Sequence, residues 1–490
     1  MAEATGSFLQ RFTVLRGASR ELWITFIVKF LAVAAYAVMN STLVLWLSSD
    51  FGYSDQNALR LVAAWSLSMT VVTLLVGSFT DALGLRRTFF IGVWICIVAR
   101  LVMALTTVKW VALVAGLFPL AVGEALGTPV MVAAVRKYST TKQRSISFSI
   151  FYMMMNVGFL AAAYLFDWFR EGMGERGQLT LPIIDTNVST YRTLFLVSCG
   201  IEVLLLPMLY FIRRGAEMTD EGLKITPEHV RYPGANLLRS FGLTIRDGVR
   251  DTVKLFAGLL QQSGFYRLLA FLMLIAFLKL IFMQMYYVFP KFGIRELGEG
   301  APVGRLWAIN AYIVIFLVPI VGALTQRFSA YRMVILGGII SAISVFIMAL
   351  PTVWFEPAAN SELFKRWIAG GYLHLPMGHV HPYYAMITCY VVVLSFGEAF
   401  YSPRVYEYAA AIAPKGQEAS YASLSYIPFL LAKLLIGTFS GELLARYCPE
   451  VGVRQSGTMW LFIAMTASIA PVGLIALSRY IRVREAGRED

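Results

Sequence analysis

Long apolar runs alternate with short polar stretches along almost the whole chain of 490 residues. A helix needs about 20 mostly apolar residues to cross the hydrocarbon core of a bilayer. By that measure the pattern predicts twelve membrane-spanning helices, over residues 22–48, 59–83, 88–107, 109–135, 145–168, 191–212, 265–290, 304–327, 332–350, 381–412, 418–445 and 457–480. The runs are continuous rather than alternating in polarity, which excludes a transmembrane β-barrel. We therefore expect an all-α membrane protein.

The composition supports this fold class. Only 14% of the residues are charged and 58% are hydrophobic, whereas a soluble globular protein carries roughly 25% charged residues. The four cysteines lie far apart, which excludes a disulfide scaffold and a cysteine-based zinc module. The first apolar run is too long for the core of a signal peptide, so we expect it to be retained.

Lysine and arginine gather in alternate loops, as in Arg86/Arg87, Arg136/Lys137 and the tail from Arg479 onward. Cytoplasmic loops of membrane proteins are enriched in these residues. The distribution predicts that both termini are cytoplasmic, which requires an even number of spans. We expect a plasma membrane protein, in the inner membrane if the source is bacterial. The net charge of +13 then reflects loop topology, and no nucleic-acid partner is expected.

The segment 214–264 is more polar than its surroundings and divides the chain into an N-terminal six-helix bundle, 1–213, and a C-terminal one, 265–490. Apolar residues recur in it at helical spacing: Ile245, Val249, Val253, Phe256 and Leu260. We expect a cytoplasmic linker with an amphipathic helix that lies in the membrane interface. A plain connecting helix packed on the bundles is the alternative.

A short turn after the second predicted span reads Gly77-Ser-Phe-Thr-Asp81-Ala-Leu-Gly84-Leu-Arg86-Arg87, and a degenerate copy begins 245 residues later, at Gly322. Glycine permits a tight reversal, and the acid pairs with arginines or caps a helix. Placed between the second and third predicted spans of a twelve-span chain, the motif resembles the inner-loop motif of the major facilitator superfamily. The resemblance implies two six-helix bundles around a central cavity, with this loop as a gating latch during alternating access. An ordinary basic turn is the alternative.

Two further stretches are similar to the proton-dependent oligopeptide transporter family: Phe151-Tyr152 followed by Asn156 and Gly158, and Gly397-Glu398 followed by Ser402-Pro403. In that family the position of Glu398 reads the substrate amine. The chain lacks the family's Glu-x-x-Glu-Arg motif in the first helix and has Thr128 in place of its fourth-helix lysine. Those residues serve proton coupling and recognition of the peptide carboxylate, so another substrate or coupling scheme is the alternative.

Charges within the predicted spans are the main candidates for function, since an ion is costly there and faces a cavity or a partner. Glu398 lies midway along 381–412 and Lys279 midway along 265–290. A desolvated carboxylate can bind a cation, pair with a lysine or titrate. We expect Glu398 to bind substrate or couple protons, with Lys279 as its partner. A purely structural ion pair is the competing interpretation.

Other polar residues in the spans complete the candidate set. Lys29, Tyr36 and Asn40 share one helical face in the first span, where Lys29 lies near enough to the cytoplasm to snorkel. Many such residues only bond helix to helix, and this is the alternative for all of them. The remaining candidates for substrate binding or coupling are Glu124, Tyr152, Asn156, Asn310 and Ser402.

Enzymatic chemistry is not indicated. His374, His379 and His381 form a tract of a kind that can bind zinc or copper, but no nearby cysteine or carboxylate completes a site. No phosphate-binding loop and no nucleophile elbow is present. We therefore expect no enzyme activity, no cofactor and no metal.

The sequence as a whole predicts a monomeric secondary active transporter that carries a small polar solute, a di- or tripeptide or an amino-acid-like molecule, by proton-coupled symport. The first alternative is a carrier or exporter of a sugar, nucleoside, organic ion or drug without that proton coupling. The second is a receptor that uses the same fold and does not transport.

Overall fold

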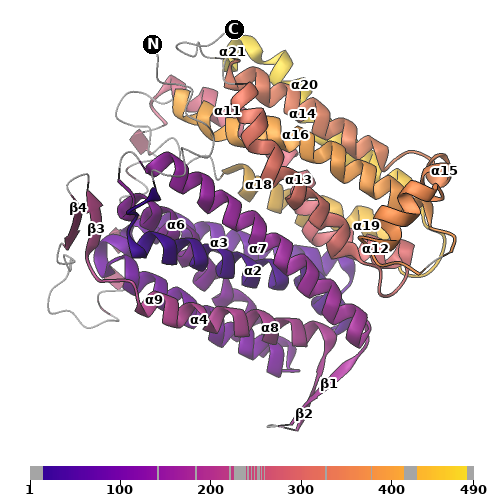
Figure 1. The fold of residues 1–490 in the computed structure, drawn as a ribbon, viewed down its shortest axis with the longest axis horizontal. Helices are drawn as coiled ribbons and strands as arrows, with labels where there is room; N and C mark the ends of the chain where they lie inside the picture. Colours follow the sequence, from indigo (N-terminus) through magenta and orange to yellow (C-terminus); the bar gives the residue numbers. More distant parts are fainter. Residues whose placement is uncertain are drawn as a thin grey trace.

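The fold was analysed in a computed structural model, which describes residues 15–140, 143–182, 185–219, 222–225, 260–325, 328–376, 378–412 and 427–482, with single positions between 239 and 258. Long helices dominate it, and Figure 1 shows two groups of them side by side, one from each half of the chain. The predicted all-helical character of the apolar runs is confirmed.

The N-terminal half places its helices where the apolar runs lie. They are α2 (Arg20–Ser49), α3 (Asp55–Leu83), α4 (Leu85–Leu105), α5 (Lys109–Val111), α6 (Phe118–Tyr138), α7 (Arg144–Met173), α8 (Thr190–Val203) and α9 (Leu205–Tyr210). A π-helical turn, Ala112–Leu117, joins α5 to α6 in one continuous rod.

The C-terminal half repeats this plan. Its helices are α11 (Ser263–Tyr287), α12 (Phe289–Leu297), α13 (Val303–Leu324), α14 (Ala330–Ile347), α15 (Glu356–Ala359), α16 (Pro382–Ile412), α18 (Ile427–Leu435), α19 (Gly441–Tyr447), α20 (Ser456–Ala476) and α21 (Ser478–Ile481). Another π-helical turn, Ile436–Ser440, joins α18 to α19.

Ten helices of the described part of the chain are long and apolar enough to cross a membrane. Helix α3 and the segment from α18 to α19 occupy the two other predicted spans and are not among these ten. Part of each falls on residues whose side chains are not described. The helical ranges thus follow the sequence pattern closely.

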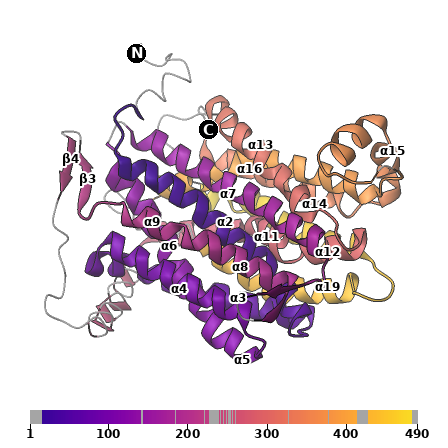
Figure 2. The ribbon, with the colours of Figure 1, turned by 60° about the horizontal axis from the view of Figure 1, so that its bottom comes forward.

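Two short β-hairpins interrupt the helical fold and were not predicted. Strands β1 (Gln178–Leu181) and β2 (Thr186–Ser189) pair antiparallel, as do β3 (Ala216–Thr219) and β4 (Gly222–Ile225). The β3–β4 hairpin occupies the start of the predicted linker, and Figure 2 shows it projecting beyond the helices. Half of the predicted amphipathic helix of the linker, including Ile245, lies outside the described residues, and the positions described between 246 and 258 are helical.

Small residues allow the helices to approach closely, as is common in membrane bundles. A Cβ added at Gly337 on α14 would lie 2.6 Å from the carbonyl oxygen of Gly397 on α16. On α7, a Cβ added at Gly158 would lie 2.8 Å from the carbonyl oxygen of Phe30 on α2. The α14–α16 contact fixes the backbone directly beside Glu398.

Candidate functional site

Four predicted site residues of the C-terminal half meet in the structure, and we name them the central polar cluster: Glu398, Asn310, Lys279 and Ser402. The Asn310 side chain on α13 donates hydrogen bonds to Glu398 Oε2 at 2.9 Å and to Ser395 Oγ at 3.0 Å, both on α16. The cluster therefore joins α13 to α16 through a carboxylate within the bundle.

Lys279 on α11 completes this cluster. Its Nζ donates to Ser402 Oγ at 3.4 Å and lies 5.7 Å and 5.1 Å from the ring centres of Phe282 and Tyr401. Ser402 lies one turn after Glu398 on α16. A carboxylate, an ammonium group, an amide and a hydroxyl thus share one buried region, an arrangement that can exchange protons or bind a polar solute group.

Asn40 on α2 reaches the other half of the molecule, whereas Tyr36 packs within its own half. The Tyr287 hydroxyl on α11 donates to Asn40 Oδ1 at 2.8 Å, so this bond crosses between the halves. Tyr36 stacks on Trp65 of α3 with ring centres 6.5 Å apart. Of the predicted polar face of the first span, Asn40 therefore contacts the other half of the molecule.

Three other predicted residues lie apart from the cluster. The Asn156 amide donates to the carbonyl oxygen of Tyr152 in its own helix at 3.0 Å, which is a local bond. Lys29 lies 4.6 Å from the ring centre of Phe151 on α7 and is only 4% exposed. The lysine is therefore buried against an aromatic ring.

Glu124 belongs to an ion triad within the N-terminal half. Arg100 on α4, fully buried, pairs with Glu124 on α6 and with Glu202 on α8, the latter at 3.1 Å. One guanidinium group thus ties three helices together. Arrangements of this kind fix helix packing, which is the structural alternative for Glu124.

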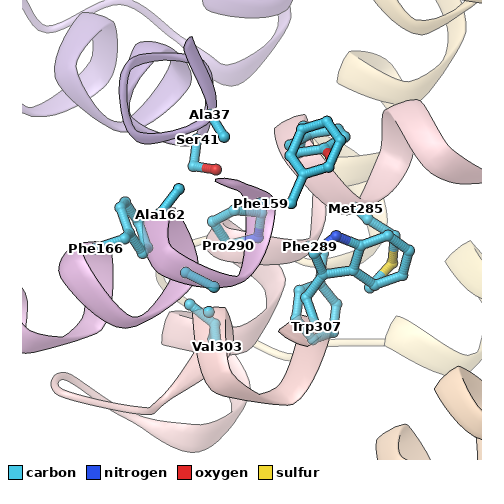
Figure 3. A pocket seen from close by; sticks show the side chains of 13 residues that line it. Ala37, Ser41, Phe159, Ala162, Phe166, Met285, Phe289, Pro290, Val303 and Trp307 are labelled. Carbon is cyan, nitrogen blue, oxygen red and sulfur yellow. The ribbon is translucent and has the colours of Figure 1, made fainter. Parts of the chain in front are cut away.

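A pocket lies between the two halves (Figure 3), and its empty space of about 410 Å³ includes its opening to solvent. Ala37 and Ser41 of α2 and Phe159 of α7 line it from one half, and Tyr286 of α11 and Trp307 of α13 line it from the other. None of its lining residues is charged. The remaining lining residues are Ala162, Ala163, Phe166, Met285, Phe289, Pro290, Val303 and Gly304.

Sequence analysis did not identify this pocket. Aromatic residues in membrane spans usually pack in the core, and nothing along the chain marks Phe159 and Trp307 as neighbours across an interface. Trp307 contacts both Tyr286 and Phe282, and Phe282 lies beside Lys279. The aromatic wall of the pocket therefore leads to the central polar cluster.

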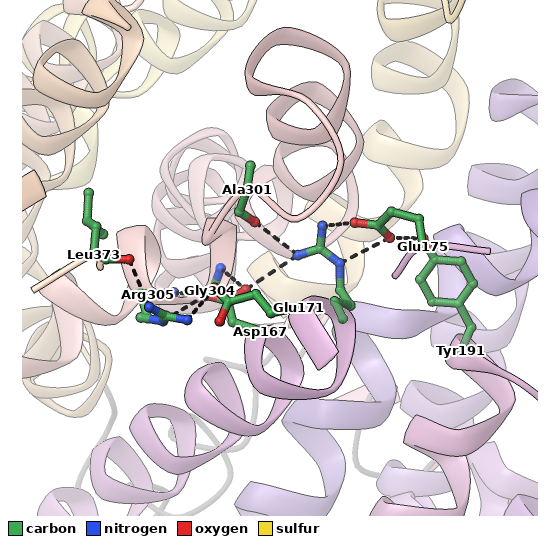
Figure 4. Close-up of polar contacts among 9 residues, drawn as sticks. Asp167, Glu171, Glu175, Tyr191, Ala301, Gly304, Arg305 and Leu373 are labelled. Carbon is green, nitrogen blue, oxygen red and sulfur yellow. Dashed lines mark hydrogen bonds and ion pairs between the residues drawn. The ribbon is translucent and has the colours of Figure 1, made fainter. Parts of the chain in front are cut away.

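Ion pairs join the halves at the end of the bundle opposite the chain termini, which we call the distal end (Figure 1). Figure 4 shows the first group, the α7–α13 network. Asp167 on α7 accepts hydrogen bonds from the backbone N–H groups of Gly304, at 2.9 Å, and Arg305, at 2.6 Å, at the start of α13. Arg170 donates to the carbonyl oxygen of Ala301 at 3.2 Å.

Further carboxylates and a loop extend this network. Arg170 also pairs with Glu175, which accepts from the Tyr191 hydroxyl. The Arg305 side chain pairs with Glu171 and donates to the carbonyl oxygen of Leu373 at 2.8 Å. The network therefore links α7, α8, α13 and the segment before α16.

A second group, the α3–α12 network, lies at the same end. Asp55 at the start of α3 pairs with Lys291, and with Arg295 at 2.7 Å, both on α12. Burial is the main cause that lowers the pKa of Lys291 below its ordinary value, and the Asp55 carboxylate opposes that shift. Both networks hold the two halves together at the distal end.

The predicted gating motif is described only in part. Gly84 has a φ of +84° immediately before α4, a conformation that favours glycine. Arg86 donates to the carbonyl oxygen of Tyr210 at 2.9 Å, and Arg87 is exposed. The surroundings of Gly77 and Asp81 lie outside the described residues. The gating role of the motif stays a prediction.

In the histidine tract, His379 Nε2 lies 3.4 Å from Glu356 Oε1, within hydrogen-bonding distance. No group of three histidine, cysteine or acidic side chains placed to hold a metal occurs in the described ranges.

Comparison with known proteins identifies the family. The family model for the Major Facilitator Superfamily matches residues 25–364. The chain belongs to the major facilitator superfamily. No curated protein sequence matches this superfamily member.

Solved structures of other transporters are similar to this superfamily member over nearly their whole length. A POT family transporter in complex with 5-aminolevulinic acid has a TM-score of 0.69 and 14% identity, with 95% of this chain and 97% of that chain covered. A peptide transporter POT in complex with sulfate has a TM-score of 0.67 and 16% identity, with 96% and 98% covered.

A bacterial homologue of the human drug peptide transporters PepT1 and PepT2 has a TM-score of 0.63 and 17% identity, with 94% and 98% of the two chains covered. At these identities the likeness establishes the fold. The predicted resemblance to the POT family is thus confirmed at the level of the fold, and membrane transport is the activity shared by these neighbours.

Proposed function

We propose that the protein is a secondary active transporter that couples proton movement to symport of a small polar solute, in the first place a di- or tripeptide or an amino-acid-like molecule. The observation that carries this proposal is the central polar cluster, in which Glu398 is bound to Asn310 and shares its buried region with Lys279, which is bound to Ser402. A proton taken up by Glu398 removes its charge and weakens its hold on both partners, so protonation and solute binding are coupled at one place.

Alternating access provides the transport cycle. In this proposal twelve spans cross the plasma membrane with both termini in the cytoplasm, and the distal end faces outside. The α7–α13 and α3–α12 networks then close the outer side, and the halves rock about the pocket between them when these ion pairs break. The titles of the structural neighbours, which name peptide transporters, support peptides as the first solutes to test.

The experiment is uptake into proteoliposomes with and without an imposed proton gradient. We expect Glu398→Gln to abolish accumulation driven by the gradient, because a neutral amide does not titrate. Glu299→Gln is the matched control, since Glu299 is exposed in the α12–α13 loop. Uptake that ignores the gradient, together with a fully active Glu398→Gln variant, would refute proton coupling.

One observation favours a second candidate, a carrier or exporter of a less polar organic solute. The pocket is lined by uncharged and mostly apolar residues, including Phe159 and Trp307, and such a lining binds an apolar body better than a bare peptide backbone. Competition between peptides and aromatic solutes in the same proteoliposomes distinguishes the two candidates. A static receptor fits less well, because both contacts at the distal end are networks of ion pairs that can open.

A further inference from the structure

Two buried lysines differ from every other buried charge of the described residues in that the structure gives them no polar partner. They are Lys29 on α2, 4% exposed, and Lys433 on α18, 6% exposed. The one contact that the described residues give the Lys29 ammonium group is a cation–π contact with the ring of Phe151. By contrast, Lys291 pairs with Asp55, Arg100 with two carboxylates, and Lys279 with the central polar cluster.

Both lysines belong to helices that reach the interface between the halves. Residues four apart lie on one helical face, and Lys433 shares its face with Gly437, which packs directly on Ala63 of α3 in the other half. Lys29 shares its face with Asn40, which bonds to Tyr287 across the interface. One uncompensated cation is therefore contributed by each half.

The two lysines also lie at the same depth. Lys29 precedes Asn40 by eleven residues, about 16 Å along a helix. Ser440 bonds to Gln284, which lies one turn before Tyr287 on α11. Because Lys433 precedes Ser440 by seven residues, it lies about 15 Å along the helix from the level of the Asn40–Tyr287 bond. Both lie on the side of the Asn40–Tyr287 bond that is nearer the chain termini.

A buried ammonium group without a counter-ion is costly, by several kcal/mol or more, so an anion is favoured beside each of these lysines. The pocket lies around the level of the Asn40–Tyr287 bond and beyond it, toward the distal end, and its aromatic walls suit an apolar body. We propose that the solute is an amphipathic organic anion, whose acidic group is attracted by Lys29 and Lys433 from the two halves. This inference rests on the proposed transport function and narrows its substrate class.

Four compounds with one aromatic side chain test the charge preference: N-acetylphenylalanine, its neutral amide, zwitterionic phenylalanine and cationic phenylalaninamide. Binding to the purified full-length protein is measured by thermal shift. We expect the anion to bind about tenfold or more tightly than the neutral amide, a difference of about 1.4 kcal/mol. Equal or tighter binding of the neutral or cationic compound would overturn the inference.

Variants make the assignment specific. Lys29→Met and Lys433→Met each remove an uncompensated charge, so each is expected to keep or raise the melting temperature of the ligand-free protein and to lose the preference for the anion. Lys279→Met is the matched control, because it leaves Glu398 without its cation and is expected to lower that temperature. A Lys29→Met/Lys433→Met double variant that binds the anion as the wild type does would also overturn the inference.

Uptake by proteoliposomes separates this inference from the proposed function. Gradient-driven accumulation of phenylalanine without any accumulation of the N-acetyl anion refutes the anionic class and leaves proton-coupled transport standing. Tight binding of the anion without accumulation of any of the four compounds refutes the transport function and leaves the anion site standing.

Discussion

At the scale of the residue, the fate of each intramembrane charge depends on its partners. The sequence marks Glu124, Arg100 and Glu202 as costly ions, but only the fold shows that they form one triad. In the same way Glu398 and Lys279 stand out along the chain, whereas Asn310 as the donor to Glu398 is a result of packing between α13 and α16. The identity of a buried charge is therefore predictable, and its partner is not.

The triad yields a prediction about stability. Arg100→Met leaves Glu124 and Glu202 buried without a cation, and breaking a buried ion pair costs about 3–5 kcal/mol. We expect a large fall in the melting temperature of the purified protein in detergent. Arg176→Met, at an exposed loop position, is the control and is expected to change stability by about 0.5 kcal/mol or less. Equal melting temperatures for the two variants would contradict a structural role for the triad.

At the scale of the element, the sequence predicts the helices well because each apolar run is long enough to cross a bilayer. It does not predict the β1–β2 and β3–β4 hairpins, since strands of four residues carry too short a pattern. It also cannot pair helices, because contacts such as the one between Gly337 and Gly397 depend on residues 60 positions apart. The central polar cluster was predictable by residue type, but the aromatic pocket was not.

The α14–α16 contact gives the second stability test. Gly337→Ala places a methyl group against the backbone of Gly397, and overpacking of this kind typically costs about 1–3 kcal/mol. We expect lower thermal stability and impaired binding at the adjacent Glu398. Gly200→Ala on α8 is the matched control, since a Cβ there meets nothing within 4 Å, and it is expected to be neutral or stabilising by up to about 1 kcal/mol. A neutral Gly337→Ala variant would show that the two helices have room to separate.

At the scale of the whole molecule, two ion networks join the halves at the distal end. The pocket and the central polar cluster lie nearer the chain termini than these networks. Asp167 is central to the first network because it accepts from two backbone N–H groups of α13. Opening of this end requires these bonds to break, so the networks set the balance between the closed and open states.

This arrangement predicts a change in access to the pocket. In a background with the native cysteines replaced, a Ser41→Cys probe in the pocket is expected to react faster with a membrane-impermeant maleimide added from outside when Asp167→Asn is also present. Asp185→Asn, in the exposed β1–β2 turn, is the control and is expected to leave the rate unchanged. Equal rates for the two variants would mean that the α7–α13 network does not hold the distal end closed.

The central claim, proton-coupled transport through the Glu398 site, is tested most directly by measuring solute accumulation and internal pH together in proteoliposomes under an imposed proton gradient. We predict that solute accumulates above its external concentration and that protons enter in matching amounts. A protonophore and the Glu398→Gln substitution are each expected to abolish both. Solute that only equilibrates, with no proton entry and no effect of the protonophore, would contradict it.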